Sequence, residues 1–389
     1  MRLKLAIVTY GMLTAPAFAQ GTAPIEIELN VESTLVGAAD FDSEATDTEP
    51  LLGEISLSGS AEKVLENGVR IRGRADLRYQ HDHPKRPGGT GGFGSLSGAP
   101  VGAFSGLSNG QQIETSDDRA RFETAYLQID GGYGELRAGK GPGIAARFYE
   151  GPQTALSYAR LDTALLDTSG LGIIRSRHDL TGPSAKISYA SPRMLGLRAG
   201  ISYTPSANAD GLDRRPAAGT SQSAPDMSNA VELALNGTHR FRSNGLRIDG
   251  MLAWSRADTK DRAGIAPYGT VETVSAGTRL EFNDFTIGGS WLESNNGLPG
   301  ADYRAWSSGI GHEALDAIWT LTYGEAEDDG SATEASAWRL GVSKSITDTV
   351  DLGFAFTSDS LETSIVNQRS EGVVVEITLL TEILKLTRN

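Results

Sequence analysis

The most regular pattern in the chain is the stretch VRIRGRADLRY, residues 69–79. Apolar or small residues occupy every second position from Val69 to Tyr79, and the positions between them hold four arginines and Asp76. Because successive side chains of a β-strand point to opposite faces, this alternation predicts a strand with one apolar and one charged face. In a soluble sheet the arginines would face bulk water, whereas in a membrane barrel they would face a water-filled lumen.

Similar alternation recurs along most of the chain, for example in residues 25–31, 195–203 and 315–323. We count about sixteen such segments of about ten residues, the length that a tilted strand needs to cross a bilayer. Aromatic residues lie near segment ends, where interfacial girdles form: Trp254, Trp291, Trp319, Tyr323 and Trp338. The pattern predicts an all-β fold, a transmembrane antiparallel β-barrel of about 16 strands.

The lengths of the connections also favour a barrel. Very short turns, such as residues 130–132 and 283–284, alternate with long loops at 80–118, 141–178 and 205–226. Outer-membrane barrels have short periplasmic turns and long outer loops, whereas a soluble sandwich or solenoid does not require this alternation. An arginine on the lipid face at mid-bilayer costs roughly 2–4 kcal/mol, so the arginines of 69–79 are expected in the lumen.

The first residues have the features of a secretory signal peptide. Arg2 and Lys4 precede an apolar run at 5–15, and Ala17-Phe18-Ala19 precedes Gln20. The run is too short for a membrane anchor. We therefore expect residues 1–19 to be removed and residues 20–389 to form a single barrel domain in the outer membrane.

Charge and cysteine content exclude several functions. The net charge is −14 and becomes −16 without Arg2 and Lys4, which makes nucleic acid an improbable partner. The chain has no cysteine, so it has no disulfide, thiolate metal site or thiol chemistry.

Four short motifs resemble binding sites without completing them. Residues 134–141 nearly match a phosphate-binding loop but end in Gly141, where that loop has Ser or Thr. Residues 141–146 match the glycine pattern of a dinucleotide-binding site, but the crossover helix and parallel strand that such a site requires do not follow. His81-Asp82-His83 lacks further obvious metal ligands. The acidic loop residues could bind Ca²⁺ or bridge lipopolysaccharide, with a solvated turn as the alternative: Glu325, Glu327, Asp328 and Asp329. We expect no cofactor.

Two stretches resemble the hairpins of Gram-negative trimeric porins. Residues 121–143, RFETAYLQIDGGYGELRAGKGPG, are similar to the family's strand–turn–strand R-x-A-Y-V-G-L-x-G-x-F-G-x-L-x-L-G-R. Residues 184–205, SAKISYASPRMLGLRAGISYTP, resemble the following hairpin. The resemblance implies a homotrimeric, 16-stranded outer-membrane channel, surrounded by lipid and lipopolysaccharide, for small hydrophilic solutes.

The resemblance also implies an inward-folding third outer loop, here residues 141–178, that sets acids against a basic wall. The acids of this loop are Glu150, Asp162 and Asp167. The basic wall residues would be Arg70, Arg72, Arg74, Arg78, Arg137, Lys186 and Arg198. The loop also offers basic residues, and it lacks the acidic motif P-E-F-G-G-D of enterobacterial porins.

The C-terminus departs from the family, which usually ends on an aromatic residue used in assembly, whereas this chain ends at Asn389. Either the last strand ends near Leu380 and a tail follows, or the assembly signal is unusual.

Three functions remain open from the sequence. The first is a general-diffusion porin without chemistry, and the second is a porin specific for a sugar or an anion. The third is an outer-membrane enzyme or adhesin on a barrel scaffold. We expect no enzyme, because neither G-x-S-x-G nor H-E-x-x-H occurs.

Overall fold

The computed structural model describes most of the chain between residues 24 and 388. The described residues are 24–44, 48–85, 92–94, 96, 99–111, 118–162, 165–209, 211–212, 222–223, 225–261, 264, 266–365 and 367–388. The predicted signal peptide, residues 1–19, and the predicted mature terminus Gln20 lie outside them. Within these ranges no helix is long and apolar enough to cross a membrane.

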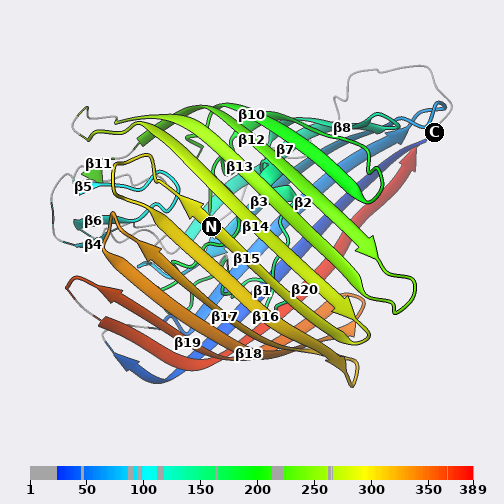
Figure 1. Cartoon of the computed structure of the whole chain (residues 1–389). Helices are drawn as coiled ribbons and strands as arrows, with labels where there is room; N and C mark the ends of the chain where they lie inside the picture. Colours follow the sequence, from blue (N-terminus) through cyan, green and yellow to red (C-terminus); the bar gives the residue numbers. More distant parts are fainter. Residues whose placement is uncertain are drawn as a thin grey trace, which may run out of the picture.

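Sixteen antiparallel strands close into one barrel, in which β1 pairs with β20 (Figure 1). In barrel order they are β1 (Ile25–Glu44), β2 (Leu51–Val64), β3 (Arg70–His81), β7 (Asp118–Gly131), β8 (Gly134–Lys140), β9 (Ala185–Ala190), β10 (Leu197–Ser206), β12 (Pro225–Arg240), β13 (Arg247–Asp261), β14 (Thr270–Phe282), β15 (Phe285–Ser294), β16 (Tyr303–Ala314), β17 (Ala317–Asp328), β18 (Thr333–Thr347), β19 (Val350–Thr363) and β20 (Asn367–Arg388). Short strands in the loops are β4 (Gly92–Gly94), β5 (Ala99–Pro100), β6 (Ser108–Gln111) and β11 (Gln222–Ser223). The predicted all-β barrel is confirmed.

The barrel is apolar outside and mostly polar or small inside. On β17 the outward Leu321 is 50% exposed, whereas the inward Thr320 and Thr322 are 3% and 2% exposed. Polar side chains line the interior, and large apolar side chains cover the surface that contacts lipid. This arrangement is the reverse of a soluble protein, and the alternation in sequence predicted it.

The two ends of the barrel differ in their connections. At one end, two-residue turns such as 283–284 and 315–316 join neighbouring strands. Leu315 and Asp316 have φ values of 58° and 55°, as a type I′ turn requires at both central positions. The long loops leave the other end, at the left of Figure 1. The predicted contrast between short turns and long loops is confirmed.

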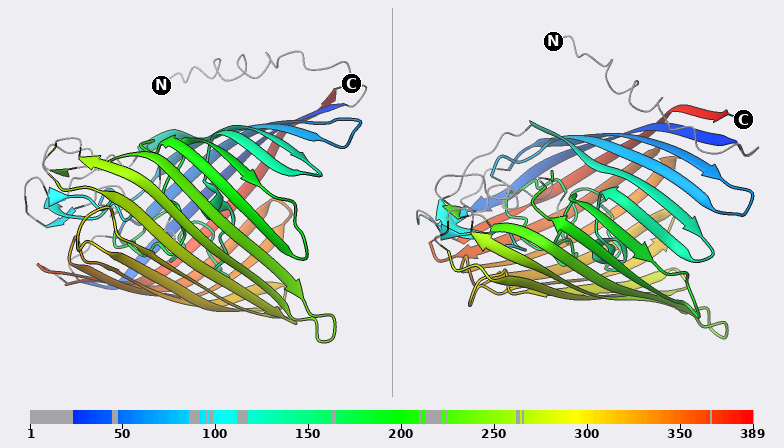
Figure 2. Two further views of the ribbon diagram at one scale, coloured as in Figure 1. Left: turned by 45° about the horizontal axis from the view of Figure 1, so that its top comes forward. Right: turned by 90° about the horizontal axis from the view of Figure 1, so that it is seen from above.

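The last strand extends beyond Leu380, where one of the two predicted alternatives ended it. β20 pairs with β19 only as far as Leu379, opposite Val350, but it continues beside β1 until Arg388 pairs with Ile25. Both views of Figure 2 show the ends of β1 and β20 side by side. An end near Leu380 followed by a tail is therefore wrong, because β1 supplies hydrogen-bonding partners for the additional residues.

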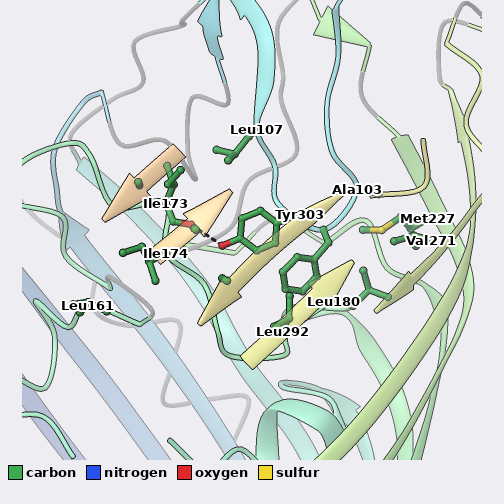
Figure 3. Packing of buried hydrophobic residues seen from close by; sticks show 14 of the residues in the cluster. Ala103, Leu107, Leu161, Ile173, Ile174, Leu180, Met227, Val271, Leu292 and Tyr303 are labelled. Atoms are coloured by element: carbon green, nitrogen blue, oxygen red, sulfur yellow. Dashed lines mark hydrogen bonds between the residues drawn. The ribbon is translucent and has the colours of Figure 1, made fainter. Parts of the chain in front are cut away.

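The largest apolar core lies inside the barrel, near the long loops. Leu180 comes from a loop and packs with Leu292 and Tyr303 of the wall (Figure 3). Phe104 comes from another loop, and its ring centre lies 5.7 Å from that of Tyr303. The Tyr303 hydroxyl donates a hydrogen bond to the carbonyl oxygen of Ile173 (2.8 Å) and accepts one from the backbone N–H of Arg175 (2.8 Å). The loops therefore fill part of the lumen instead of covering it from outside.

Candidate functional site

A cavity of about 410 Å³ lies between loop 141–178 and one side of the barrel wall. Strands β1, β2, β3 and β7 contribute its charged wall residues: Glu32, Glu54, Arg74, Asp76, Arg78 and Glu123. Segment 158–183 contributes the facing charges: Asp162, Arg175, Arg177 and Asp179. Both sides of the cavity therefore carry charges of both signs.

The arginines on the cavity wall are paired with carboxylates on the same wall. Arg78 donates from Nε to Glu54 Oε1 (2.6 Å), and its Nη2 also bonds Glu54 Oε2. Gln80 Nε2 donates to the same carboxylate (3.0 Å) and to the carbonyl oxygen of Leu165 in the loop (2.9 Å). Arg74 Nε lies 3.0 and 3.1 Å from the two carboxylate oxygens of Asp76. The ladder of arginines is thus largely neutralised locally.

Two of the predicted wall arginines lie outside the cavity, nearer the short turns. Arg70 Nε lies 3.1 Å from Glu62 Oε1, and Arg72 also pairs with Glu62. Their side chains are 48% and 38% exposed, so both are open to water.

The remaining predicted basic residues are more deeply placed. Lys186 is buried, and its Nζ donates to the carbonyl oxygens of Gly141 (2.5 Å) and Gly182 (2.6 Å). These bonds tie the start of loop 141–178 and the segment just after its end to β9. Arg137 and Arg198 lie together beside Glu135, in a separate cluster with Arg147.

The three predicted acidic residues of the loop have different environments. Asp162 lines the cavity and accepts hydrogen bonds from Arg160 (2.9 and 2.8 Å) and the Tyr149 hydroxyl (2.6 Å). Burial opposes its ionisation, but the Arg160 guanidinium keeps the pKa of Asp162 below its ordinary value. Glu150 lies on the other side of the barrel, 3.9 Å from Arg279, and burial raises its pKa.

Asp167 is fully buried and stabilises the loop backbone. Its carboxylate accepts the N–H groups of Gly170 (3.0 Å) and Gly172 (2.8 Å). Burial raises the pKa of Asp167. The structure therefore brings only Asp162 of the three acids together with Arg74 and Arg78.

Two glutamates of the barrel wall, which the sequence analysis missed, hold the loop in place. Glu376 on β20 accepts the backbone N–H groups of Ser157 (2.7 Å), Tyr158 (3.0 Å) and Ala159 (3.1 Å). Glu232 on β12 accepts the N–H of Ala145 (3.2 Å) in the single helical turn α3 (Ile144–Arg147). Wall carboxylates on opposite sides thus bind the loop backbone directly.

Glycines on the lumen face mark where the loop lies against the wall. A Cβ added to Gly288 would lie 2.7 Å from the carbonyl oxygen of Gly151. A Cβ added to Gly324 would lie 2.6 Å from Leu161 Cδ2, and one added to Gly341 would lie 2.8 Å from Ala155 Cβ. The same loop approaches glycines of three other strands: Gly277, Gly309 and Gly353. A glycine inside a strand often marks close approach of another backbone, and this signal could have located the loop from the sequence.

The motifs set aside in the sequence have ordinary structural roles. Residues 134–140 form β8, which pairs with β7 in the predicted hairpin. His81 pairs with Asp118, whereas Asp82 accepts hydrogen bonds from Arg119 (3.3 Å) and the N–H of Asp167 (2.9 Å). Among the described residues, no group of three or more His, Cys, Asp or Glu side chains is placed to hold a metal ion. Calcium binding in the outer loops stays a prediction.

Several proteins of solved structure share this fold. The chain is similar to OprB of Pseudomonas putida, with 7% identity over 92% of this chain and 94% of that chain and a TM-score of 0.60. It is similar to the anion-selective porin of Comamonas acidovorans, with 12% identity over 92% and 99% and a TM-score of 0.55. The trimer form of OmpT of Vibrio cholerae has 11% identity over 92% of this chain and 99% of that chain, with a TM-score of 0.53. At such identities the likeness establishes the fold alone.

Sequence comparison establishes the family. No curated protein sequence matches the chain. The model of the Gram-negative porin family matches residues 5–364, nearly the whole chain. The chain therefore belongs to the Gram-negative porins and forms an outer-membrane channel for passive diffusion.

Proposed function

We propose that this porin is a general-diffusion channel of weak selectivity, narrowed by loop 141–178. The observation that carries the proposal is the cavity of about 410 Å³ between this loop and strands β1, β2, β3 and β7. In this proposal the cavity is the narrowest part of the route, and the loop is the element that narrows it.

The charges around the cavity explain the weak selectivity that we propose. Arg74 and Arg78 on the wall alternate with Glu54 and Asp76, and the loop side also has both signs. Coulomb interactions are screened less in such a confined space than at an open surface. Polar solutes can orient between the two signs, whereas an apolar solute would have to displace ordered water. The route needs no cofactor and no catalytic group.

We also propose that the protein is a homotrimer. The sequence resemblance to trimeric porins supports this, and so does the fold it shares with the trimer form of OmpT. Chemical cross-linking of native outer membranes tests the trimer, and a single monomeric band would contradict it. Contact with lipopolysaccharide stays a prediction.

Conductance of the purified protein in planar bilayers tests the proposed channel. We expect single-channel conductance to rise with KCl concentration without saturating, and a small reversal potential in a salt gradient. A neutral sugar should not lower the current along a saturating curve; such a curve would instead favour a sugar-specific porin. Absence of conductance from folded, heat-modifiable protein would contradict the proposal.

A further inference from the structure

Three arginines surround one glutamate on the lumen wall, on the side of the cavity nearer the short turns. We name Glu135, Arg137, Arg147 and Arg198 the Glu135 cluster. Arg198 Nη2 lies 3.1 Å from Glu135 Oε2, Arg137 Nη2 lies 3.6 Å from Oε1, and Arg147 also contacts Oε1. Three guanidinium groups share one carboxylate, so the cluster carries a net charge of +2.

The other hydrogen-bond partners of these arginines are neutral, and the next carboxylate on this wall, that of Asp130 on β7, lies opposite Glu135. Arg137 donates to Gln128 Oε1 (2.8 Å), and its guanidinium carbon lies 3.9 Å from the centre of the Tyr126 ring. Arg147 donates to Ser188 Oγ (3.3 Å), and Arg198 donates to the carbonyl oxygen of Ser191 (2.9 Å). These contacts fix the three groups in place without neutralising them.

The cluster is partly shielded from water but still open to the lumen. The arginine side chains are 17%, 12% and 26% exposed for Arg137, Arg147 and Arg198. The buried Nε of Arg137 has no hydrogen-bond partner. Partial burial weakens screening by water and salt, so the excess charge acts more strongly here than at an open surface.

The cluster lies next to the cavity along the lumen wall, in the direction of the short turns. Arg74, which lines the cavity, lies opposite Tyr126 on β7. Two residues further along β7, Gln128 lies opposite both Arg72 on β3 and Arg137 on β8. A solute that leaves the cavity toward the short turns therefore passes next to the Glu135 cluster.

We infer that the Glu135 cluster binds an oxyanion, a phosphate or carboxylate group of a passing solute. Planar guanidinium groups bind such anions through paired, charge-assisted hydrogen bonds. Because Arg147 belongs to loop 141–178, whereas Arg137 and Arg198 belong to the barrel wall, a bound anion would bridge the loop and the wall. The inference rests on the proposed channel and adds the class of solute that the channel favours.

Two lumen arginines on other strands have a more even balance of charge. Arg339 pairs with Asp359 (2.7 Å), and Arg247 lies between Asp249 (2.8 Å) and Glu281 (3.3 Å). Arg247 is therefore a matched control, because it is an arginine on the lumen face whose charge is already compensated.

The test is a titration of single-channel current in KCl with potassium phosphate added to both sides of the bilayer, and a parallel titration with succinate. We expect phosphate, succinate or both to lower the current along a saturating curve. If only one of the two ligands gives a saturating curve, that ligand identifies whether the cluster prefers phosphate or carboxylate. In the double variant R137Q/R198Q the half-saturating concentration should rise about tenfold or more, because hydrogen bonds to charged groups are lost. R247Q should keep the wild-type value.

A second variant gives the opposite prediction. E135Q removes the one negative charge of the cluster, so its half-saturating concentration should fall. Heat-modifiable migration in gels confirms that each variant is folded, and single R198Q replaces the double variant if that one does not fold. A conducting channel without saturation by either anion, or with equal values in wild type and R137Q/R198Q, overturns the inference alone. A folded protein that conducts no KCl overturns the proposed channel.

Discussion

Two sides of the same lumen have opposite characters. On the side of β1, β2, β3 and β7, long charged side chains such as Arg78 and Glu54 surround a cavity. On the side of β14 to β19, glycines and alanines such as Gly324 and Ala326 allow loop residues to pack directly on the wall. The strands of both sides have the same alternation of faces.

The comparison shows that the size of the inward side chains decides where the route runs. Small inward residues let the loop backbone approach the wall, and the space fills with an apolar core that contains Leu161 and Ile174. Large charged residues such as Arg74 and Arg78 leave a cavity between the wall and the loop. The side with the larger charged residues therefore keeps a cavity, and the apolar contacts of the loop with β1 and β2 are confined to the small cluster of Leu156 and Leu166 with Val36 and Leu52.

Removal of the middle of loop 141–178 should have the largest effect on the difference between the two sides of the lumen. The filled side would lose its loop layer, so both sides would become open to water. We expect single-channel conductance to rise severalfold, with assembly preserved because the sixteen strands remain paired. Bilayer recording measures the conductance, and an unchanged value would show that the loop does not narrow the route.

Loss of a wall carboxylate that holds the loop should come next. In Glu376→Gln the three N–H groups of residues 157–159 lose a charged acceptor. We expect a loss of about 1.5–3 kcal/mol in the free energy of unfolding and increased current noise. Glu371→Gln is the control, because this glutamate pairs with Arg369 outside the loop. Equal stability of both variants would mean that Glu376 does not hold the loop.

Enlargement of a small residue on the filled side should also destabilise the protein. A Cβ at Gly341 would lie 2.8 Å from Ala155 Cβ, whereas a Cβ at Gly73 on β3 meets nothing within 4 Å. Gly341→Val should cost about 1–3 kcal/mol through overpacking, and Gly73→Val should cost less. Denaturant titration of refolded protein measures both variants. The reverse order would contradict the close contact of the loop and the wall.

Charge changes on the open side should alter selectivity more than stability. Arg74→Ser and Arg72→Ser should each shift the reversal potential toward cations, and replacement of Asp162 by Asn should shift it toward anions. Arg74 lines the cavity and Arg72 does not, so the shift should be larger for Arg74. If neither arginine variant changes selectivity or conductance, strand β3 does not line the narrowest part.

A pH titration should give the smallest effect. Burial raises the pKa of Glu150, whereas Arg160 keeps the pKa of Asp162 low despite its burial. As the pH falls from 7, Glu150 therefore takes up its proton before Asp162 and at a higher pH than an ordinary glutamate. The reversal potential should move toward anions in this range, and Glu150→Gln should remove that shift. An identical pH profile in the variant would exclude Glu150 as its origin.

The sequence by itself determined the barrel. The alternation in residues 69–79 and its repeats depend only on the period of a strand, and lipid demands an apolar outer face wherever a strand crosses it. Short turns such as 315–316 and the hairpin at 121–140 are also local features, so residues close in sequence specify them.

The tertiary structure alone decided which charges meet. Arg78 and Glu54 are 24 residues apart, and only the register of β2 against β3 brings them together. Glu376 reaches a loop more than 200 positions away because the barrel closes on itself. Neither relation has a local period, so the sequence predicted an arginine ladder facing acids and missed that the ladder carries its own carboxylates. Alternation specifies a face of a strand, whereas register and closure specify the partner on that face.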